Sequence, residues 1–103
     1  MITCDACGAE LAHDEARVAV CGLERHTCTN PAGVTFVVGC YASAPGVEVA
    51  SNESSEWSWF PGYRWQLVTC RACGRHVGWR YLRVDGSFFG LIERGATAHP
   101  TSG

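Results

Sequence analysis

The amino-acid sequence predicts an all-β domain built from short antiparallel strands. Apolar segments are short and interrupted by turn-forming residues, and several alternate apolar and polar positions as half-buried strands do. No window has the spacing of an amphipathic helix. With 103 residues the chain has the length of a single domain, 1–103, and its small, polar stretch 95–103 is expected to fray.

The first half of the chain contains two expected strands. In segment 17–21, valine alternates with other residues, and the turn-forming Gly22 follows the segment. Segment 34–42 is rich in β-branched residues and lies between two turn-forming stretches, 30–33 and 44–46. These turns limit each strand to a few residues.

The second half contains three more expected strands. Segments 63–69 and 77–84 alternate with period two, and the polar stretch 51–55 that precedes them is expected to be a loop. Asp85-Gly86 is a hairpin signal, so 87–92 is expected to return beside the preceding strand.

Composition excludes several classes of function. All eight basic residues are Arg, so lysine-dependent Schiff-base and P-loop chemistry is excluded. The formal net charge is -2 and no basic stripe is present, which argues against a nucleic-acid partner. The apolar runs are too short to cross a bilayer, and the first residues lack the pattern of a signal peptide. We therefore expect a cytoplasmic protein with no membrane partner.

Four of the seven cysteines form two Cys-x-x-Cys-Gly units, and 62 residues lie between Cys7 and Cys70. Two such turns that meet in space give a closed, tetrahedral site, which is typical of structural zinc. The alternatives are two unrelated turns or a thioredoxin-like redox pair, and the redox motif expects a βαβ context that this chain lacks. The predicted ligands of a structural Zn²⁺ are Cys4, Cys7, Cys70 and Cys73.

The other cysteines have more ordinary interpretations. Cys21 and Cys40 fall within apolar strand patterns and are expected to be small buried side chains. Cys28 follows His26 by two residues, which leaves open a second metal site or a nucleophile–base pair, although neither has a third partner nearby in sequence. The remaining histidines are expected at the surface: His13, His76 and His99.

Aromatic residues are concentrated late in the chain. Nine of the eleven lie between residues 57 and 89, including all four tryptophans. Period two places Trp79 and Tyr81 on one strand face with Val77 and Arg83. Trp65 shares a face with Leu67 in the strand before, and Trp59 stands at the start of a turn set by Pro61 and Gly62.

These tryptophans favour a binding pocket over a simple core. A core is usually built from Leu, Val and Ile, whereas each indole N–H needs a partner. Three indoles from a stiff turn and two strands would form a box with flat walls. Such a box suits a quaternary ammonium or a flat neutral ring, and composition does not choose between them.

One run of residues is distinctive enough to indicate a family. It begins Glu56-Trp57-Ser58-Trp59-Phe60-Pro61-Gly62-Tyr63-Arg64-Trp65 and continues through Cys70-x-x-Cys73 to His76-Val77-Gly78-Trp79. Together with the first cysteine pair, it closely resembles the thalidomide-binding domain of cereblon, known as the CULT domain. The resemblance implies a β-tent: two antiparallel sheets at a steep angle, pinned by zinc. Its single-domain form suggests the bacterial type.

The resemblance also implies a ligand and its contacts. Cyclic imides would be held in a cage of three tryptophans: glutarimides, thalidomide-type drugs, uracil-like rings or imides at cleaved protein C-termini. The cage walls would be Trp59, Trp65 and Trp79, with Tyr81 as the floor. Asn30 and Pro31 would lie over the mouth, and backbone groups around Trp57, Ser58 and Trp59 would hydrogen-bond the imide edge. Glu56, next to them in sequence, is included among the expected ligand-binding residues.

Two departures from the family qualify this expectation. Trp57 stands where the human family member has His, so a side-chain contact from that His would be lost. The chain has neither a Lon-like domain nor an adaptor-binding segment, so no ubiquitin-ligase adaptor is expected as a partner.

The leading interpretation is therefore a non-enzymatic cyclic-imide binder. Type B methionine sulfoxide reductases resemble this fold, but they need a late nucleophilic Cys and none follows Cys73. Imide hydrolysis would need an open metal or an activated nucleophile, whereas four thiolates close the zinc. A methyl-ammonium reader would need a carboxylate, for which Glu56 is the candidate.

Overall fold

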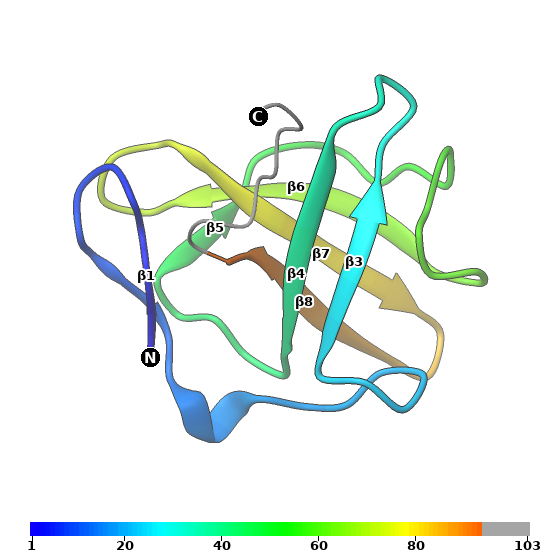
Figure 1. Cartoon of the computed structure of the whole chain (residues 1–103), viewed down its shortest axis with the longest axis horizontal. Helices are drawn as coiled ribbons and strands as arrows, with labels where there is room; N and C mark the ends of the chain where they lie inside the picture. The colour runs from blue at the N-terminus through cyan, green and yellow to red at the C-terminus, as the bar shows by residue number, and fades with distance from the viewer. Residues whose placement is uncertain (94–103) are drawn as a thin grey trace.

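The computed structural model describes residues 1–93, which form short strands and a single turn of 3₁₀ helix (Figure 1). This part of the chain contains no helix with the length and hydrophobicity needed to span a bilayer. The elements in chain order are β1 (Ile2–Thr3), β2 (Glu10–Ala12), η1 (Asp14–Ala16), β3 (Arg25–Thr29), β4 (Thr35–Tyr41), β5 (Val47–Val49), β6 (Arg64–Cys70), β7 (His76–Arg83) and β8 (Gly86–Ile92).

The strands form two antiparallel sheets, as predicted. The larger has six strands in the order β3-β4-β8-β7-β6-β5, and the smaller pairs β1 with β2. Neighbours in sequence are paired at β3–β4, β6–β7 and β7–β8, so short turns build most of the large sheet. In Figure 1 the β1–β2 hairpin lies at one end of that sheet, beside the turn that joins β6 to β7.

The structure confirms four of the five expected strands and corrects one. Strands β4, β6, β7 and β8 match the predicted segments within a residue or two. Segment 17–21 is not a strand: Arg17 and Val20 form only isolated bridges, and Cys21 has a left-handed backbone with φ of 52°. That conformation turns the chain at Cys21-Gly22 instead of extending it. The predicted frayed tail at 95–103 lies outside the described residues.

Two apolar clusters occupy opposite faces of the large sheet. One packs under the β1–β2 hairpin and includes Leu11, Val68 and Leu91. The other includes Tyr81 and Phe88, and the tryptophans pack against it. The sheet thus separates a core that supports the cysteines from a core that supports the aromatic cluster.

One expected face assignment is wrong. Val77 was expected on the same face as Trp79, but it packs with Leu91 in the cluster under the hairpin. The β6–β7 register shifts between Val68 and Thr69, so alternation is interrupted beside Val77. A β-bulge redirects a side chain in this way, and the shift turns Val77 away from the tryptophans.

Gly90 allows the ring of Tyr81, the expected floor of the cage, to lie close to the sheet. A Cβ atom at Gly90 would lie 2.7 Å from Cγ1 of Val38 and 3.0 Å from the Tyr81 ring. A contact of 2.7 Å does not occur at real Cβ atoms, so a side chain here would displace Val38 and would also crowd the ring of Tyr81. Gly90 pairs directly with Trp79 across β7–β8 and therefore lies beneath the centre of the aromatic cluster.

Candidate ligand cavity and metal centre

The four predicted cysteine ligands come together at one end of the molecule. Their Sγ atoms all lie within 4.8 Å of one another. The separation is 3.7 Å between Cys4 and Cys73, and 3.6 Å between Cys7 and Cys70. A tetrahedral metal with metal–sulfur bonds of about 2.3 Å needs sulfurs roughly 3.8 Å apart, so the cluster could hold a metal ion.

The two cysteine turns have the same backbone hydrogen bonds. In each, the N–H of the first cysteine, Cys4 or Cys70, donates to the carbonyl five residues later, at 2.9 and 2.8 Å. In each, the carbonyl of that cysteine accepts a hydrogen bond of 2.8 Å from the N–H of the trailing glycine. Gly8 and Gly74 have φ of 78° and 83°, a conformation that glycine adopts at little cost. The motif is therefore a repeated structural unit.

The backbone of the second turn favours a thiolate. Desolvation raises the pKa of Cys70, but the amide groups of Cys73 and Ala72 donate to its sulfur and outweigh that effect, so its pKa is lowered to about 7. Cys4 and Cys70 are buried, whereas Cys7 and Cys73 are exposed. Four thiol ligands with this geometry suit a metal ion that prefers sulfur.

The remaining cysteines do not form a second centre. Within residues 1–93, the four-cysteine group is the only set of three or more ligand residues placed for a metal. His26 Nε2 lies 2.8 Å from the carbonyl of Val20, and the ring meets Phe60 edge-on at 5.0 Å, which is a structural role. Cys40 is buried as expected, but Cys21 is exposed because the chain turns there.

The aromatic residues surround a cavity of about 420 Å³ on the other face of the sheet. Trp65 lies opposite Tyr81, and Leu67 lies opposite Trp79, in the β6–β7 ladder. Directly paired residues share a face, so the two strands present these side chains together. The cavity is lined by Asn30, Pro31, Phe36, Trp57, Trp59, Trp65, Leu67, His76, Trp79 and Tyr81.

Hydrogen bonds and ring contacts fix the walls of this cavity. Trp59 and Trp79 meet edge-to-face with ring centroids 4.9 Å apart. The indole N–H of Trp59 donates to the carbonyl of Thr29 at 3.0 Å, and that of Trp65 donates to the carbonyl of Glu56 at 2.7 Å. Both indoles thus have the partner that a partly buried N–H requires, and both are held in one orientation.

The loop between β5 and β6 carries the other predicted residues. Tyr63 N–H donates to the carbonyl of Phe60 at 3.0 Å, and Gly62 has φ of 89°, so the predicted rigid turn is present. Ser58 Oγ donates to the carbonyl of Phe60 at 3.1 Å and stabilises the same turn. Trp57 is 74% exposed and has φ of 58°, which is rare for a bulky residue.

The turn between β3 and β4 lies at the cavity edge. Asn30 and Val34 are joined by two hydrogen bonds of 2.9 Å, one from each backbone N–H; that of Val34 donates to Oδ1 of Asn30. The Asn30 side chain therefore closes its own turn, and Pro31 restricts the backbone further. This turn presents Asn30 and Pro31 to the cavity without a strand of its own.

The structure brings together most of the predicted ligand residues. Seven of the nine line the cavity, whereas Glu56 and Ser58 belong to the supporting loop without lining it. Sequence reasoning missed Phe36, Leu67 and His76 as lining residues. His76 is exposed overall, as expected, but its ring also contacts the cavity wall: Nε2 lies 2.9 Å from the carbonyl of Gly78, and the ring centroid lies 5.0 Å from that of Trp79. Its pKa is lowered because burial disfavours the charged ring.

The missed residues Leu67 and Phe36 could have been found only from the way the strands pair. Leu67 is opposite Trp79, and Phe36 lies opposite Cys28 in the β3–β4 hairpin. Strand β3 was not expected from the sequence, because its composition is mostly polar. Without β3, the position of Phe36 relative to the tryptophans was not accessible.

Comparison with known proteins gives cereblon sequences from fruit flies. The chain is 32% identical to cereblon of Drosophila grimshawi and 30% identical to that of Drosophila virilis, in both cases over 96% of its length. It is 31% identical to cereblon of Drosophila erecta over 85% of its length. The chain spans only 16 to 17% of these relatives. No protein-family model matches it.

Proposed function

The chain belongs to the family of cereblon-like CULT domains, and from that premise we propose that it is a non-enzymatic binding module for cyclic imides. The observation that carries the proposal is the cavity of about 420 Å³ with Trp59, Trp65 and Trp79 among its walls. Its size lies in the usual range for small-molecule sites, and flat apolar walls suit the ring carbons of a glutarimide or uracil.

The polar edge of the ring would meet backbone groups of the loop. Within residues 1–93, the carbonyl groups of Trp57, Ser58 and Trp59 accept no hydrogen bond, although Ser58 closes a hydrogen-bonded turn over Glu56 and Trp57. An imide offers one N–H donor between two carbonyl acceptors, which matches a short run of free backbone groups. The left-handed backbone at Trp57 supports this role, since strained residues cluster at binding sites.

The lining favours a neutral ligand. No acidic residue is among the described residues that line the cavity, and Glu56 is exposed outside it. A methyl-ammonium ion would therefore lack the carboxylate that usually accompanies an aromatic cage. The same lining contains no cysteine that could act as a nucleophile, which also argues against a reductase or hydrolase.

For the cysteine cluster, we propose structural Zn²⁺ held by Cys4, Cys7, Cys70 and Cys73. Four thiolates at tetrahedral spacing fill the coordination sphere of zinc, so the ion would link the β1–β2 hairpin to the β6–β7 turn. Zinc bound in this way supplies folding free energy and offers no open position for a substrate.

Binding is tested by titrating the protein with a glutarimide and with uracil, following tryptophan fluorescence and, independently, binding enthalpy by calorimetry. We expect saturable binding that weakens about 30-fold or more in Trp79→Ala, because buried aromatic anchors are worth about 2 kcal/mol or more. Val84→Ala is the control: Val84 is 98% exposed and does not line the cavity, so the affinity should remain. Unchanged affinity in folded Trp79→Ala would refute the cage.

A further inference from the structure

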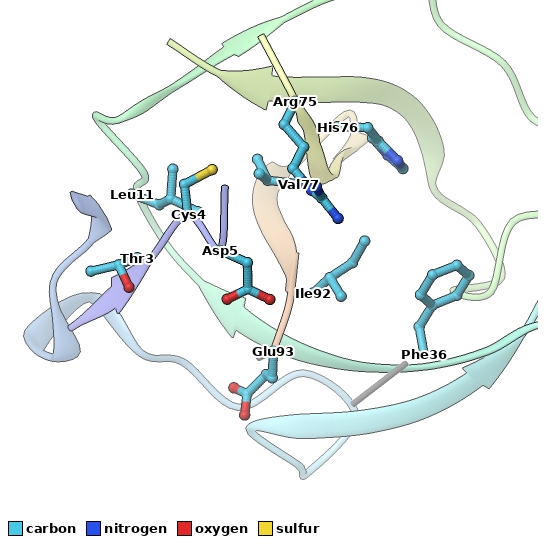
Figure 2. Close-up of a pocket in the computed structure, with 10 residues that line it drawn as sticks. All are labelled: Thr3, Cys4, Asp5, Leu11, Phe36, Arg75, His76, Val77, Ile92 and Glu93. Carbon is cyan, nitrogen blue, oxygen red and sulfur yellow. The ribbon is translucent and has the colours of Figure 1, made fainter. Parts of the chain in front are cut away.

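A second cavity, of about 380 Å³, adjoins the aromatic one (Figure 2). Phe36 and His76 line both cavities, so their side chains form the boundary between them. Figure 2 shows these two on one side of the second cavity, and Thr3, Cys4 and Asp5 on the other. A ligand whose ring occupies the aromatic cavity could extend a substituent past Phe36 and His76.

The second cavity differs from the first in its charged residues. Its lining includes Asp5, Arg75 and Glu93, whereas the described lining of the aromatic cavity has no acid and no arginine. Glu93 is already paired, because its carboxylate oxygens lie 3.2 Å from Arg17 and 2.9 Å from Arg25. Arg17 and Arg25 do not line the second cavity, so they largely neutralise the charge of Glu93 from outside it.

Arg75 is in a different position. Among the arginines within residues 1–93, it is the only one whose guanidinium has no hydrogen bond or ion pair with a described residue. Figure 2 shows this guanidinium reaching toward the middle of the lining residues. A guanidinium has five N–H donors in a planar fork that matches a carboxylate, and here no described residue uses them.

We propose that the second cavity is an anion subsite, in which Arg75 binds a carboxylate carried on the substituent of a cyclic imide. The inference rests on the proposed imide function, since the ring must first occupy the aromatic cavity. It narrows the ligand class to imides bearing an acidic side arm. Asp5 lies in the same cavity, so the carboxylate would bind on the Arg75 side of it.

Three compounds test this subsite. The parent is 3-acetamidoglutarimide; the second carries a succinyl group, which ends in a carboxylate, on the same nitrogen; the third replaces that carboxylate with a primary amide. We expect wild-type protein at low salt to bind the carboxylate about fivefold more tightly than the amide, as exposed ion pairs allow. This preference should shrink in 0.5 M NaCl, because salt screens exposed charges.

Variants identify the residue responsible. Arg75→Gln should remove the preference for the carboxylate and leave the affinity for the parent unchanged, whereas Arg75→Lys should retain part of the preference. Arg80→Gln makes the same change of charge on β7 outside both cavities and should keep the full preference. Metal content and melting temperature should match wild type in both Arg75 variants, because the Arg75 side chain has no partner within residues 1–93 to lose, whereas Arg80→Gln gives up one hydrogen bond of 3.4 Å to Gln66.

The outcomes separate the two proposals. If the parent does not bind wild-type protein, the imide function fails and the subsite fails with it. If the parent binds but wild type shows no preference for the carboxylate, or Arg75→Gln keeps that preference, the subsite alone is refuted. A loss of metal in Arg75→Gln, with the preference intact, would instead assign Arg75 as a counter-charge for the thiolate cluster.

Discussion

The two cysteine turns and the loop between β5 and β6 differ in the type of residue that adopts a left-handed backbone. Each needs a residue with positive φ. The cysteine turns place Gly8 and Gly74 there, at φ of 78° and 83°, whereas the loop places Trp57 there, at φ of 58°. Glycine adopts this conformation freely, but a side chain adds a cost of roughly 1 to 2 kcal/mol.

The two regions also differ in how completely their backbone is paired. Each cysteine turn closes the same pair of hydrogen bonds, whereas the carbonyl groups of Trp57, Ser58 and Trp59 accept none within residues 1–93. A region that holds the fold together pairs its own backbone N–H and carbonyl groups in hydrogen bonds. A region that binds a partner leaves groups free and tolerates strain. This difference distinguishes the cysteine cluster from the candidate ligand site.

The largest effect is expected at the cysteine centre. Cys70→Ser should abolish the cooperative thermal transition, because structural zinc can supply on the order of 10 kcal/mol and whole domains are stable by only about 5 to 15 kcal/mol. Circular dichroism and metal analysis measure the result. Cys21→Ser is the matched control, since Cys21 is exposed and outside the cluster, and it should melt like wild type. A folded, metal-free Cys70→Ser would contradict a structural role for the metal.

An intermediate effect is expected at Trp57. Trp57→Gly should be more stable than Trp57→Ala by about 1 kcal/mol, the reverse of the usual order, because alanine keeps the Cβ atom that the left-handed backbone disfavours. Both variants lose the same exposed indole, so their difference isolates the backbone. Chemical denaturation measures it. Equal stability of the two variants would mean that the loop stores no strain at this position.

The cysteine centre could be predicted from the sequence because its unit is local. Cys-x-x-Cys-Gly specifies a turn by itself, and only the meeting of two such turns requires the fold. Likewise, β4 and β6 to β8 were predicted because alternation and turn residues are local signals. The strand expected at 17–21 failed because a left-handed residue at Cys21 interrupts an apolar pattern, which periodicity does not detect.

The ligand cavity could be predicted only in part. Trp59, Trp65 and Trp79 were identified because they are conspicuous and lie in a specific run of residues. Phe36 and His76 reach the cavity through the β3–β4 hairpin and through a shift of register at the start of β7. Both positions depend on pairing between distant or weakly patterned segments. The residues next to Phe36 and His76 in the sequence therefore do not indicate that these side chains line the cavity.

The smallest effect concerns His76, which lies between the two regions at the start of β7. Burial lowers its pKa below the ordinary value of 6.5, so as pH falls below 6.5 the unfolded chain takes up a proton before the folded chain does. The free energy of unfolding therefore decreases across that range, and it is unaffected by His76 above it.

His76→Gln should lose less stability between pH 7 and pH 5 than wild type. The difference should be under about 1 kcal/mol, because the ring is partly exposed. Both proteins carry the same cysteines, so protonation of the metal ligands cancels in the comparison. Denaturation curves that shift equally with pH in the two proteins would show that His76 is as well hydrated in the folded domain as in the unfolded chain, and that the boundary between the cavities is open to water.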